Sequence, residues 1–192
     1  MPQPPPSLPP RVLFRFGAGF YLLVAVGGLV WIGARHGKIP LRLFVDPERW
    51  SLDLGLGVVL GLLLVAAWQG LRRRSDAARE LEGHLARLVG SLSRSEAAGL
   101  SLLSGLAEEL LFRGAIQPAW GFWPATLLFA LLHTGRERAL WLWTASAFVA
   151  GAVLGLAFAW TANLTAPVAA HTVVNAVQLS RLAGKHRAPV DW

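Results

Sequence analysis

Three short patterns contain the residues of this sequence that are best suited to chemistry. Residues 108–113 read EELLFR and place two carboxylates before an arginine. Residues 129–133 read FALLH, and residues 171–175 read HTVVN. All three patterns lie within mainly apolar stretches, and a charged side chain at the centre of a bilayer costs on the order of 3 kcal/mol to insert. We therefore treat these polar residues as candidates for function.

Helical spacing divides the first pattern into two parts. Glu109 and Arg113 are four residues apart with the acid first, which is the orientation that favours an ion pair. Glu108 points about 100° away from Glu109 and has no basic partner in its own helix. We therefore assign Glu109 and Arg113 mainly to structure and to orientation of the site, and Glu108 to chemistry as a general base. The alternative is that both glutamates are structural.

The other two patterns have the same spacing. His171 and Asn175 project from one face of a helix, and Phe129 can pack its ring beside the imidazole of His133. Counted at 1.5 Å per residue, Glu108, His133 and Asn175 each lie about 14 Å from the outer ends of their apolar stretches, and His171 about 8 Å. The four groups therefore fall in one layer of the membrane, where we expect the helices to bring them together.

A carboxylate, two imidazoles and an amide can hydrolyse an amide bond. Glu108 and His133 would activate a water molecule, while His171 and Asn175 would donate hydrogen bonds to the oxyanion. The sequence has no H-E-x-x-H motif, no G-x-S-x-G motif and no cysteine, which disfavours other hydrolytic mechanisms. We expect no cofactor, and the alternative is a zinc ion held by Glu108, His133 and His171 with a water molecule.

The composition indicates a membrane protein. Hydrophobic residues make up 54% of the chain and charged residues 15%, against about 25% charged residues in average soluble domains. Soluble, disordered and fibrous classes are therefore excluded. The net charge is +7, but the basic residues lie between apolar runs, which is typical of membrane topology rather than of nucleic-acid binding.

Six apolar stretches predict an all-α, polytopic membrane helical bundle with about six transmembrane helices. They cover about residues 14–34, 51–71, 97–117, 121–137, 139–161 and 165–182, close to the length of about 20 residues that a bilayer requires. A ridge of small residues on the fifth stretch, Ala147, Gly151, Gly155 and Ala159, predicts close helix packing.

The segment between the second and third stretches is amphipathic. Leu81, Leu85, Leu88 and Val89 recur at helical spacing opposite Arg and Glu. This pattern predicts an interfacial amphipathic helix on the inner membrane surface, and a solvated linker helix is the alternative. Residues 1–10 form a Pro-rich tail that we expect to be disordered, residues 11–95 two spans and the cytoplasmic amphipathic linker, residues 96–182 a catalytic helical core, and residues 183–192 a C-terminal tail.

The distribution of basic residues predicts the orientation of the bundle. Most Lys and Arg residues lie on one side of the predicted spans, and this side is cytoplasmic in most membrane proteins. Both termini are therefore expected to be cytoplasmic in a multi-pass protein of the cell membrane. This orientation places the four candidate groups in the outer half of the membrane.

The three patterns, in order, resemble the E-E-x-x-x-R, F-x-x-x-H and H-x-x-x-N motifs of the CPBP family. This is the CAAX protease and bacteriocin-processing family, also called Abi, of glutamic intramembrane endopeptidases. The resemblance covers about residues 96–180, which we expect to form a CPBP-like catalytic core. It implies catalytic roles for Glu108 and His133, an oxyanion site at His171 and Asn175, and a place in the site for Glu109 and Arg113, with Phe129 as a further supporting residue.

The function expected from these observations is that of an intramembrane endopeptidase. Its partners would be the lipid bilayer and a membrane-anchored or lipidated protein or peptide substrate, with no nucleic acid. The resemblance implies C-terminal processing or protein sorting, since some bacterial relatives are thought to cut C-terminal membrane anchors, and this would suit a site in the outer half. The alternatives are a non-hydrolytic immunity or scaffold protein and a proton or ion pathway lined by Glu and His.

Overall fold

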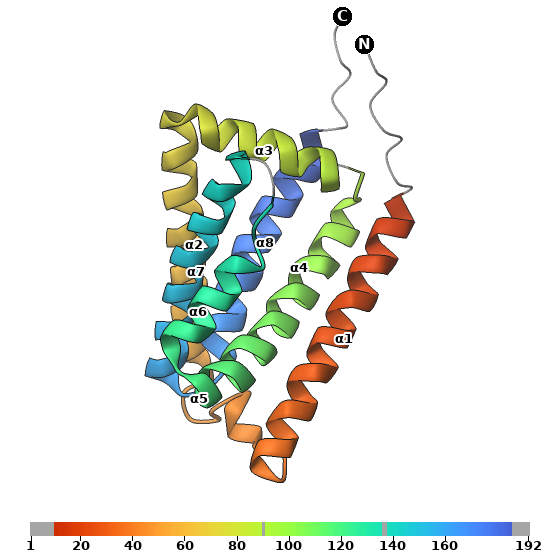
Figure 1. Cartoon of the computed structure of the whole chain (residues 1–192). Coiled ribbons are helices and arrows are strands. Elements are labelled where there is room, and N and C mark those ends of the chain that lie inside the picture. The colour runs from red at the N-terminus through yellow and green to blue at the C-terminus, as the bar shows by residue number, and fades with distance from the viewer. Residues whose placement is uncertain (1–9, 90, 136–137, 186–192) are drawn as a thin grey trace, which may run out of the picture.

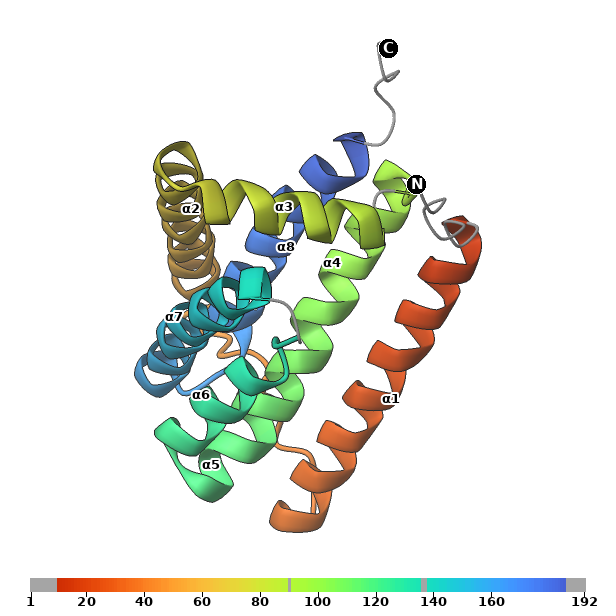
Figure 2. The ribbon, with the colours of Figure 1, turned by 45° about the horizontal axis from the view of Figure 1, so that its top comes forward.

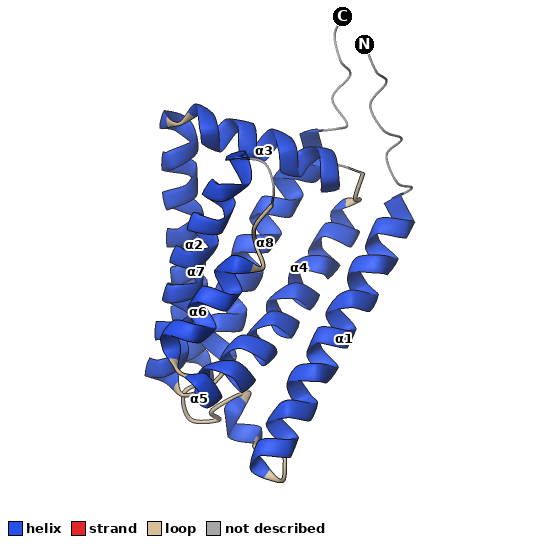
Figure 3. Ribbon diagram, in the orientation of Figure 1, coloured by secondary structure: helices blue, strands red, loops and turns tan. Residues whose placement is uncertain are grey.

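The chain folds into a bundle of helices, as a computed structural model shows for residues 10–89, 91–135 and 138–185 (Figure 1). Figure 3 shows only helices and loops in these described parts. The predicted all-α bundle is confirmed. In chain order the elements are α1 (Pro10–His36), η1 (Leu41–Leu43), α2 (Trp50–Arg74), α3 (Asp76–Val89), α4 (Arg94–Glu109), η2 (Leu110–Ile116), α5 (Gln117–Trp120), α6 (Phe122–Leu131), α7 (Arg138–Thr161) and α8 (Thr165–Lys185).

Three helices in the described parts are long and apolar enough to cross a membrane: α1, α2 and α7. They carry many large apolar side chains on their outer faces; Phe16, for example, is 77% exposed and Trp160 72%. In the bundle, α3, the start of α1 and the end of α8 lie at one end, while η1 and α5 lie at the other (Figure 1). Residues 1–9 of the expected N-terminal tail and most of the C-terminal tail lie outside the described residues, and Pro10 begins α1.

The third predicted stretch forms one continuous helical rod made of α4, η2 and α5. Its start is fixed by a capping box, in which the Ser93 hydroxyl accepts the backbone N–H of Glu96 and the Glu96 side chain accepts the backbone N–H of Ser93. Its middle, η2, is π-helical. The rod runs from Arg94 to Trp120, about 40 Å at 1.5 Å per residue, so Glu108 lies close to its middle.

The fourth predicted stretch, 121–137, is wrong as a full-length span. The helix α6 has only 10 residues, about 15 Å, which is half of a bilayer core. The cause lies at its C-terminus, where the imidazole Nδ1 of His133 donates to the carbonyl of Phe129 at 2.8 Å. The backbone N–H of His133 bonds instead to Ala130 at 3.0 Å. The side chain thus takes the acceptor that the next helical turn would use, and residues 136 and 137 lie outside the described residues.

The helix predicted to lie at the membrane surface, α3, crosses the end of the bundle, as Figure 2 shows. Ala78, Leu81 and Ala86 on its apolar face are buried, and this face packs on α7 and α8. Leu88, which the pattern placed on the same face, is 64% exposed. The amphipathic pattern of this segment therefore reflects, for the most part, packing against the ends of other helices.

The turn before α8 is held by polar bonds that fix where α8 begins. Asn163 Nδ2 donates to the carboxylate of the buried Asp53 at 2.7 Å. The backbone N–H of Leu164 donates to the carbonyl of Leu43 at 2.7 Å, and the hydroxyl of Thr165 donates to the carbonyl of Phe44 at 3.0 Å. These bonds join the start of α8 to η1 and to the start of α2, and so set the position of the residues further along α8.

Glycines allow α8 to approach its neighbours closely. A Cβ atom on Gly57 or Gly61 of α2 would collide with the carbonyl oxygen of Ala166 or Ala170. On α4, a Cβ atom at Gly105 would lie 2.5 Å from the hydroxyl of Thr172 and 3.1 Å from its backbone nitrogen. Helices packed through small residues can bring their side chains within bonding distance, and Gly105 lies one helical turn before Glu109.

We predict that Gly105→Ala lowers the free energy of unfolding by about 1–3 kcal/mol, because α4 must move away from α8. Reversible unfolding in mixed micelles with increasing SDS measures this loss. Gly27→Ala is the matched control, because a Cβ atom there meets nothing within 4 Å. Equal stability of the two variants would contradict the close packing of α4 on α8.

Candidate active site

The two glutamates stand at the end of α4, where the α-helix gives way to the π-helical η2. The side chain of Glu109 is fully buried at 0% exposure, and that of Glu108 is 12% exposed. Glu109 faces Arg113 and one nitrogen of His171, whereas Glu108 faces His133 and the other nitrogen of His171. The wider turns of a π-helix often occur at functional sites.

Glu109 forms the predicted ion pair with Arg113 and also binds His171. Its Oε1 accepts a bond from Arg113 Nη1 at 3.1 Å and one from His171 Nδ1 at 2.8 Å. Because a carboxylate can only accept, Nδ1 of this imidazole carries a proton. A single buried carboxylate oxygen therefore joins α8 to the rod that contains α4 and η2.

The guanidinium of Arg113 is held on its other side by α7. Arg113 Nη2 donates to the carbonyl of Gly151 at 2.8 Å, and one turn further Gln117 Nε2 donates to the carbonyl of Gly155 at 2.9 Å. A Cβ atom on Gly155 would meet the Phe122 ring at 2.8 Å. The predicted ridge of small residues on α7 thus exposes backbone carbonyls to two long polar side chains.

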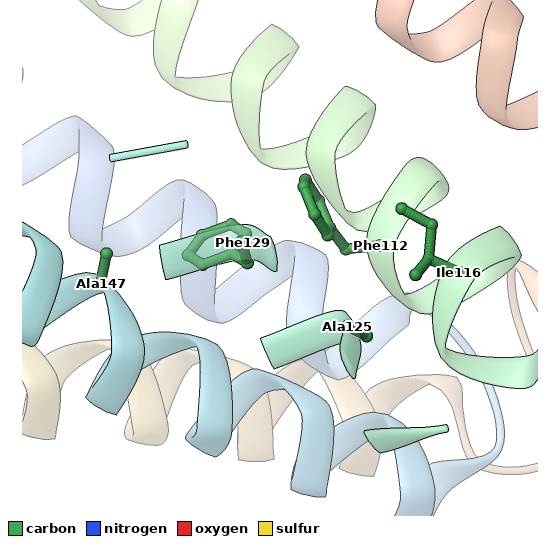
Figure 4. Packing of buried hydrophobic residues seen from close by; sticks show 5 residues of the cluster. All are labelled: Phe112, Ile116, Ala125, Phe129 and Ala147. Carbon is green, nitrogen blue, oxygen red and sulfur yellow. The ribbon is translucent and has the colours of Figure 1, made fainter. Parts of the chain in front are cut away.

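Phe129 stands between the charged groups. Its ring lies 4.6 Å from the Arg113 guanidinium, a distance at which a cation and an aromatic face attract. The same ring is 4.6 Å from the ring of His133 and 5.9 Å from that of His171, centroid to centroid. Figure 4 shows Phe129 in a cluster with Phe112, Ile116, Ala125 and Ala147, so that apolar packing from η2, α6 and α7 fixes this ring.

His133 presents one nitrogen to the site. Its Nδ1 must donate to the carbonyl of Phe129, because a carbonyl can only accept. Its Nε2 lies 3.8 Å from Oε2 of Glu108. The ring of Trp143 packs edge-on against it at 5.3 Å, and the side chain is 21% exposed. The imidazole is therefore fixed in orientation and still reachable from outside the bundle.

Glu108 faces both imidazoles with the same oxygen. Its Oε2 is 3.8 Å from His133 Nε2 and 4.0 Å from His171 Nε2, and this buried oxygen has no hydrogen-bond partner among the described residues. Both distances exceed those of a direct hydrogen bond. They suit a small polar molecule that bridges the carboxylate and an imidazole.

Asn175 is bound to α4 rather than to a glutamate. Its Nδ2 donates to the hydroxyl of Ser104 at 2.8 Å, and Ser104 donates to the carbonyl of Ser101 at 3.2 Å. Ser104 lies one helical turn before Glu108, so this bond places Asn175 on the same face of α4. An amide NH₂ group has two donors, and the second N–H of Asn175 can serve a ligand.

The structure therefore brings Glu108, Glu109 and Arg113 together with Phe129, His133 and His171, and places Asn175 one turn away. Sequence reasoning missed three side chains: Ser104, Gln117 and Tyr21, the last of which reaches Glu108 from α1. Ser104 and Gln117 continue the four-residue spacing of Glu108 and of Arg113, a signal that could have identified them. Nothing in the local pattern marks Tyr21, because it is distant in sequence.

A metal ion does not fit these side chains as they stand. In the described parts, no three His, Cys, Asp or Glu side chains are grouped to hold one. Ligand atoms around a tetrahedral zinc ion lie about 3.4 Å apart, closer than the 3.8 and 4.0 Å between Glu108 and the two imidazoles. We therefore derive no step through zinc.

Comparisons with known proteins find similarity over the segment that contains these residues. Residues 92–177 match a family model described as type II CAAX prenyl endopeptidase Rce1-like. The protein YpbD of Bacillus subtilis (strain 168), described as uncharacterized, is 40% identical over 87 residues. This alignment covers 45% of the chain and 46% of YpbD, so the match spans about half of either protein. No solved structure matches the chain significantly.

The resemblance inferred from the three motifs is confirmed over residues 92–177, which match the Rce1-like family model. The segment contains all of α4, η2, α5, α6 and α7 and most of α8, and it includes the three motifs in full. The first three helices, α1 to α3, lie outside it.

We predict that Arg113→Leu lowers the free energy of unfolding by about 3–5 kcal/mol, because the buried Glu109 carboxylate loses its fixed cation. The measurement is SDS-induced unfolding of the full chain in mixed micelles. Arg94→Leu on the same rod removes an exposed arginine and should cost less than 1 kcal/mol, as exposed ion pairs do. A similar loss in both variants would show that the pair of Arg113 and Glu109 does not stabilise the bundle.

Proposed function

We propose that this protein is an intramembrane endopeptidase of the glutamic type, which hydrolyses a peptide bond in a membrane-anchored or lipidated protein. The observation that carries this proposal is the position of Glu108, whose buried Oε2 faces Nε2 of both imidazoles at 3.8 and 4.0 Å. The match of residues 92–177 to a family described as endopeptidases supports it.

In the proposed reaction, Glu108 and His133 activate a water molecule that bridges them. The bond from His133 Nδ1 to the Phe129 carbonyl leaves the lone pair of Nε2 directed at Glu108 in the neutral imidazole. A water molecule there can donate one hydrogen to Nε2 and the other to the carboxylate. Removal of a proton as the oxygen attacks the carbonyl carbon is general-base catalysis.

The oxyanion that forms on the carbonyl oxygen would be stabilised by His171 and Asn175. His171 already donates from Nδ1 to Glu109, so its Nε2 donates only when the ring is an imidazolium, and the Glu109 carboxylate stabilises that charge. Asn175 contributes its second amide N–H. Fixed donors in a site with little water stabilise developing charge strongly.

The tetrahedral intermediate then collapses to the two products. The carbon–nitrogen bond breaks, and the proton taken from water passes from Glu108 or His133 to the leaving amine. The products are one chain with a new carboxylate and one with a new amine. Glu109, Arg113 and Phe129 orient the reacting groups, and Glu109 also stabilises the charge on His171.

The substrate proposed is a protein anchored in the membrane near its C-terminus. The match to prenyl endopeptidases supports a lipidated or membrane-bound chain. His133, at the end of the short α6, is partly exposed, and the neighbouring Leu131 and Leu132 are 60% and 65% exposed. We propose that an extended peptide reaches His133 from this flank of the bundle. C-terminal processing in the cell membrane, with both termini of this chain cytoplasmic, is part of the same proposal.

We predict that Glu108→Gln reduces cleavage about 10²–10⁴-fold, the usual contribution of a general base, while folding and insertion are preserved. The measurement compares the C-terminal peptides of membrane fractions from cells that express the wild-type chain or this variant. One or more membrane proteins should keep an uncut C-terminus in cells with the variant.

The same comparison distinguishes the alternatives. Glu48→Gln is the matched control, because Glu48 is exposed and far along the chain from the motifs, and it should leave processing unchanged. A scaffold or immunity protein would keep its activity in Glu108→Gln. A proton pathway would lose transport in Glu108→Gln with no change in any C-terminus, and either result would contradict the proposed hydrolysis.

We also propose that the reaction needs no metal ion. Cleavage by the purified full chain should therefore persist after dialysis against EDTA and 1,10-phenanthroline, because the proposed water is bound by a carboxylate and an imidazole alone. Loss of cleavage that returns on addition of zinc would instead support the metal alternative.

A further inference from the structure

The helix α1 lies beside α4 along much of its length, and both helices run in the same direction (Figures 1 and 2). Close contacts fix their register. A Cβ atom on Gly17 would lie 3.1 Å from the side chain of Leu100, and one on Gly28 would lie 3.1 Å from the backbone nitrogen of Leu111. Tyr21 stands between these two points and therefore faces the part of α4 that carries Ser104 and Glu108.

The side chain of Tyr21 turns toward the bundle at this level. Its ring packs against the buried cluster of Leu92, Leu100 and Ala183, and its neighbour Phe20 meets it edge-on at 5.4 Å. Its hydroxyl faces the Glu108 carboxylate and the Ser104 hydroxyl, and both groups are close enough to interact with it. Phe20 itself is 53% exposed, so the two adjacent rings have different surroundings.

These contacts complete a chain of polar groups. Asn175 donates to Ser104, Ser104 contacts Tyr21, and Tyr21 contacts Glu108. A phenol hydroxyl is both donor and acceptor, whereas a carboxylate only accepts. Tyr21 can therefore donate to Glu108. Ser104, whose own proton goes to the Ser101 carbonyl, lies next to Tyr21 and accepts from Asn175, so the base and the amide proposed for the oxyanion are joined by neighbouring polar groups.

We propose that Tyr21 is a positioning residue for Glu108: its hydroxyl holds the carboxylate in the orientation that faces His133 and His171. This inference rests on the proposed hydrolytic function. It assigns part of the site to α1, which lies outside the Rce1-like segment of residues 92–177. A hydrogen bond to a charged group is among the stronger ones, and a base held in one orientation reacts faster than a mobile one.

The sequence offers a direct probe of this contact, because Tyr21 is the single tyrosine of the chain. Growth with 3-fluorotyrosine labels this position alone, so the folded full chain in nanodiscs should give one fluorine NMR resonance from the label. We expect Glu108→Gln and Ser104→Ala each to shift this resonance. Glu48→Gln, which changes an exposed carboxylate, should leave it in place. An unchanged chemical shift in Glu108→Gln would overturn the inference.

Kinetics test the positioning role itself. The substrate is the protein identified by the comparison of C-termini. We expect Tyr21→Phe to lower its rate of cleavage at saturating concentration about tenfold, with KM unchanged within about twofold. On a Glu108→Gln background the same change should have no further effect on the residual rate, because Tyr21 acts through Glu108. Phe20→Leu, on the exposed neighbour, should leave the rate unchanged.

These measurements separate the two proposals. The role of Tyr21 would be overturned if Tyr21→Phe cleaved as fast as the wild-type chain. It would also be overturned if Tyr21→Phe lowered the rate by the same factor in the wild-type and Glu108→Gln backgrounds. Either result would leave the proposed hydrolysis intact. If the wild-type chain cleaves nothing, the proposed hydrolysis fails, and the fluorine resonance still decides whether Tyr21 holds Glu108.

Discussion

The buried carboxylate of Glu109 is the interaction on which the rest of the site depends. One of its oxygens accepts bonds from both Arg113 and His171, so that a single atom is bonded to η2 and to α8. A buried charge is costly unless it is paired. With Glu108 nearby, two carboxylates share one fixed cation, and a proton on the imidazole of His171 would balance the second negative charge. The need for charge balance thus couples the structural pair to the proposed chemistry.

This polar centre requires helices that pack closely, and glycines make that possible. Gly105 allows α4 to approach Thr172 of α8, and Gly151 exposes its carbonyl to the guanidinium of Arg113. Phe129 then fills the space among the charged groups. The site is therefore fully buried on the side of Glu109 and partly exposed on the side of His133. Such a division suits hydrolysis, which needs both a fixed base and access for a peptide.

Four-residue spacing was enough to predict the ion pair, because it reports directly which residues share a helix face. The length of the apolar stretches predicted the helical bundle, and the common depth of the motif residues along their helices predicted that they meet. The length of α6 was not predictable in this way, because the helix ends where the His133 side chain takes the carbonyl of Phe129. Tyr21 was missed since its contact with Glu108 depends on the register of two helices, which no local pattern contains.

The most direct measurement of the central claim, that water itself attacks the peptide bond, is a single turnover in water enriched in heavy oxygen with hydroxylamine present. Direct attack predicts one heavy oxygen in the new C-terminal carboxylate and no hydroxamate product. A hydroxamate would instead reveal an acyl-enzyme on a side chain such as Ser104, and would contradict the role assigned to Glu108 and His133.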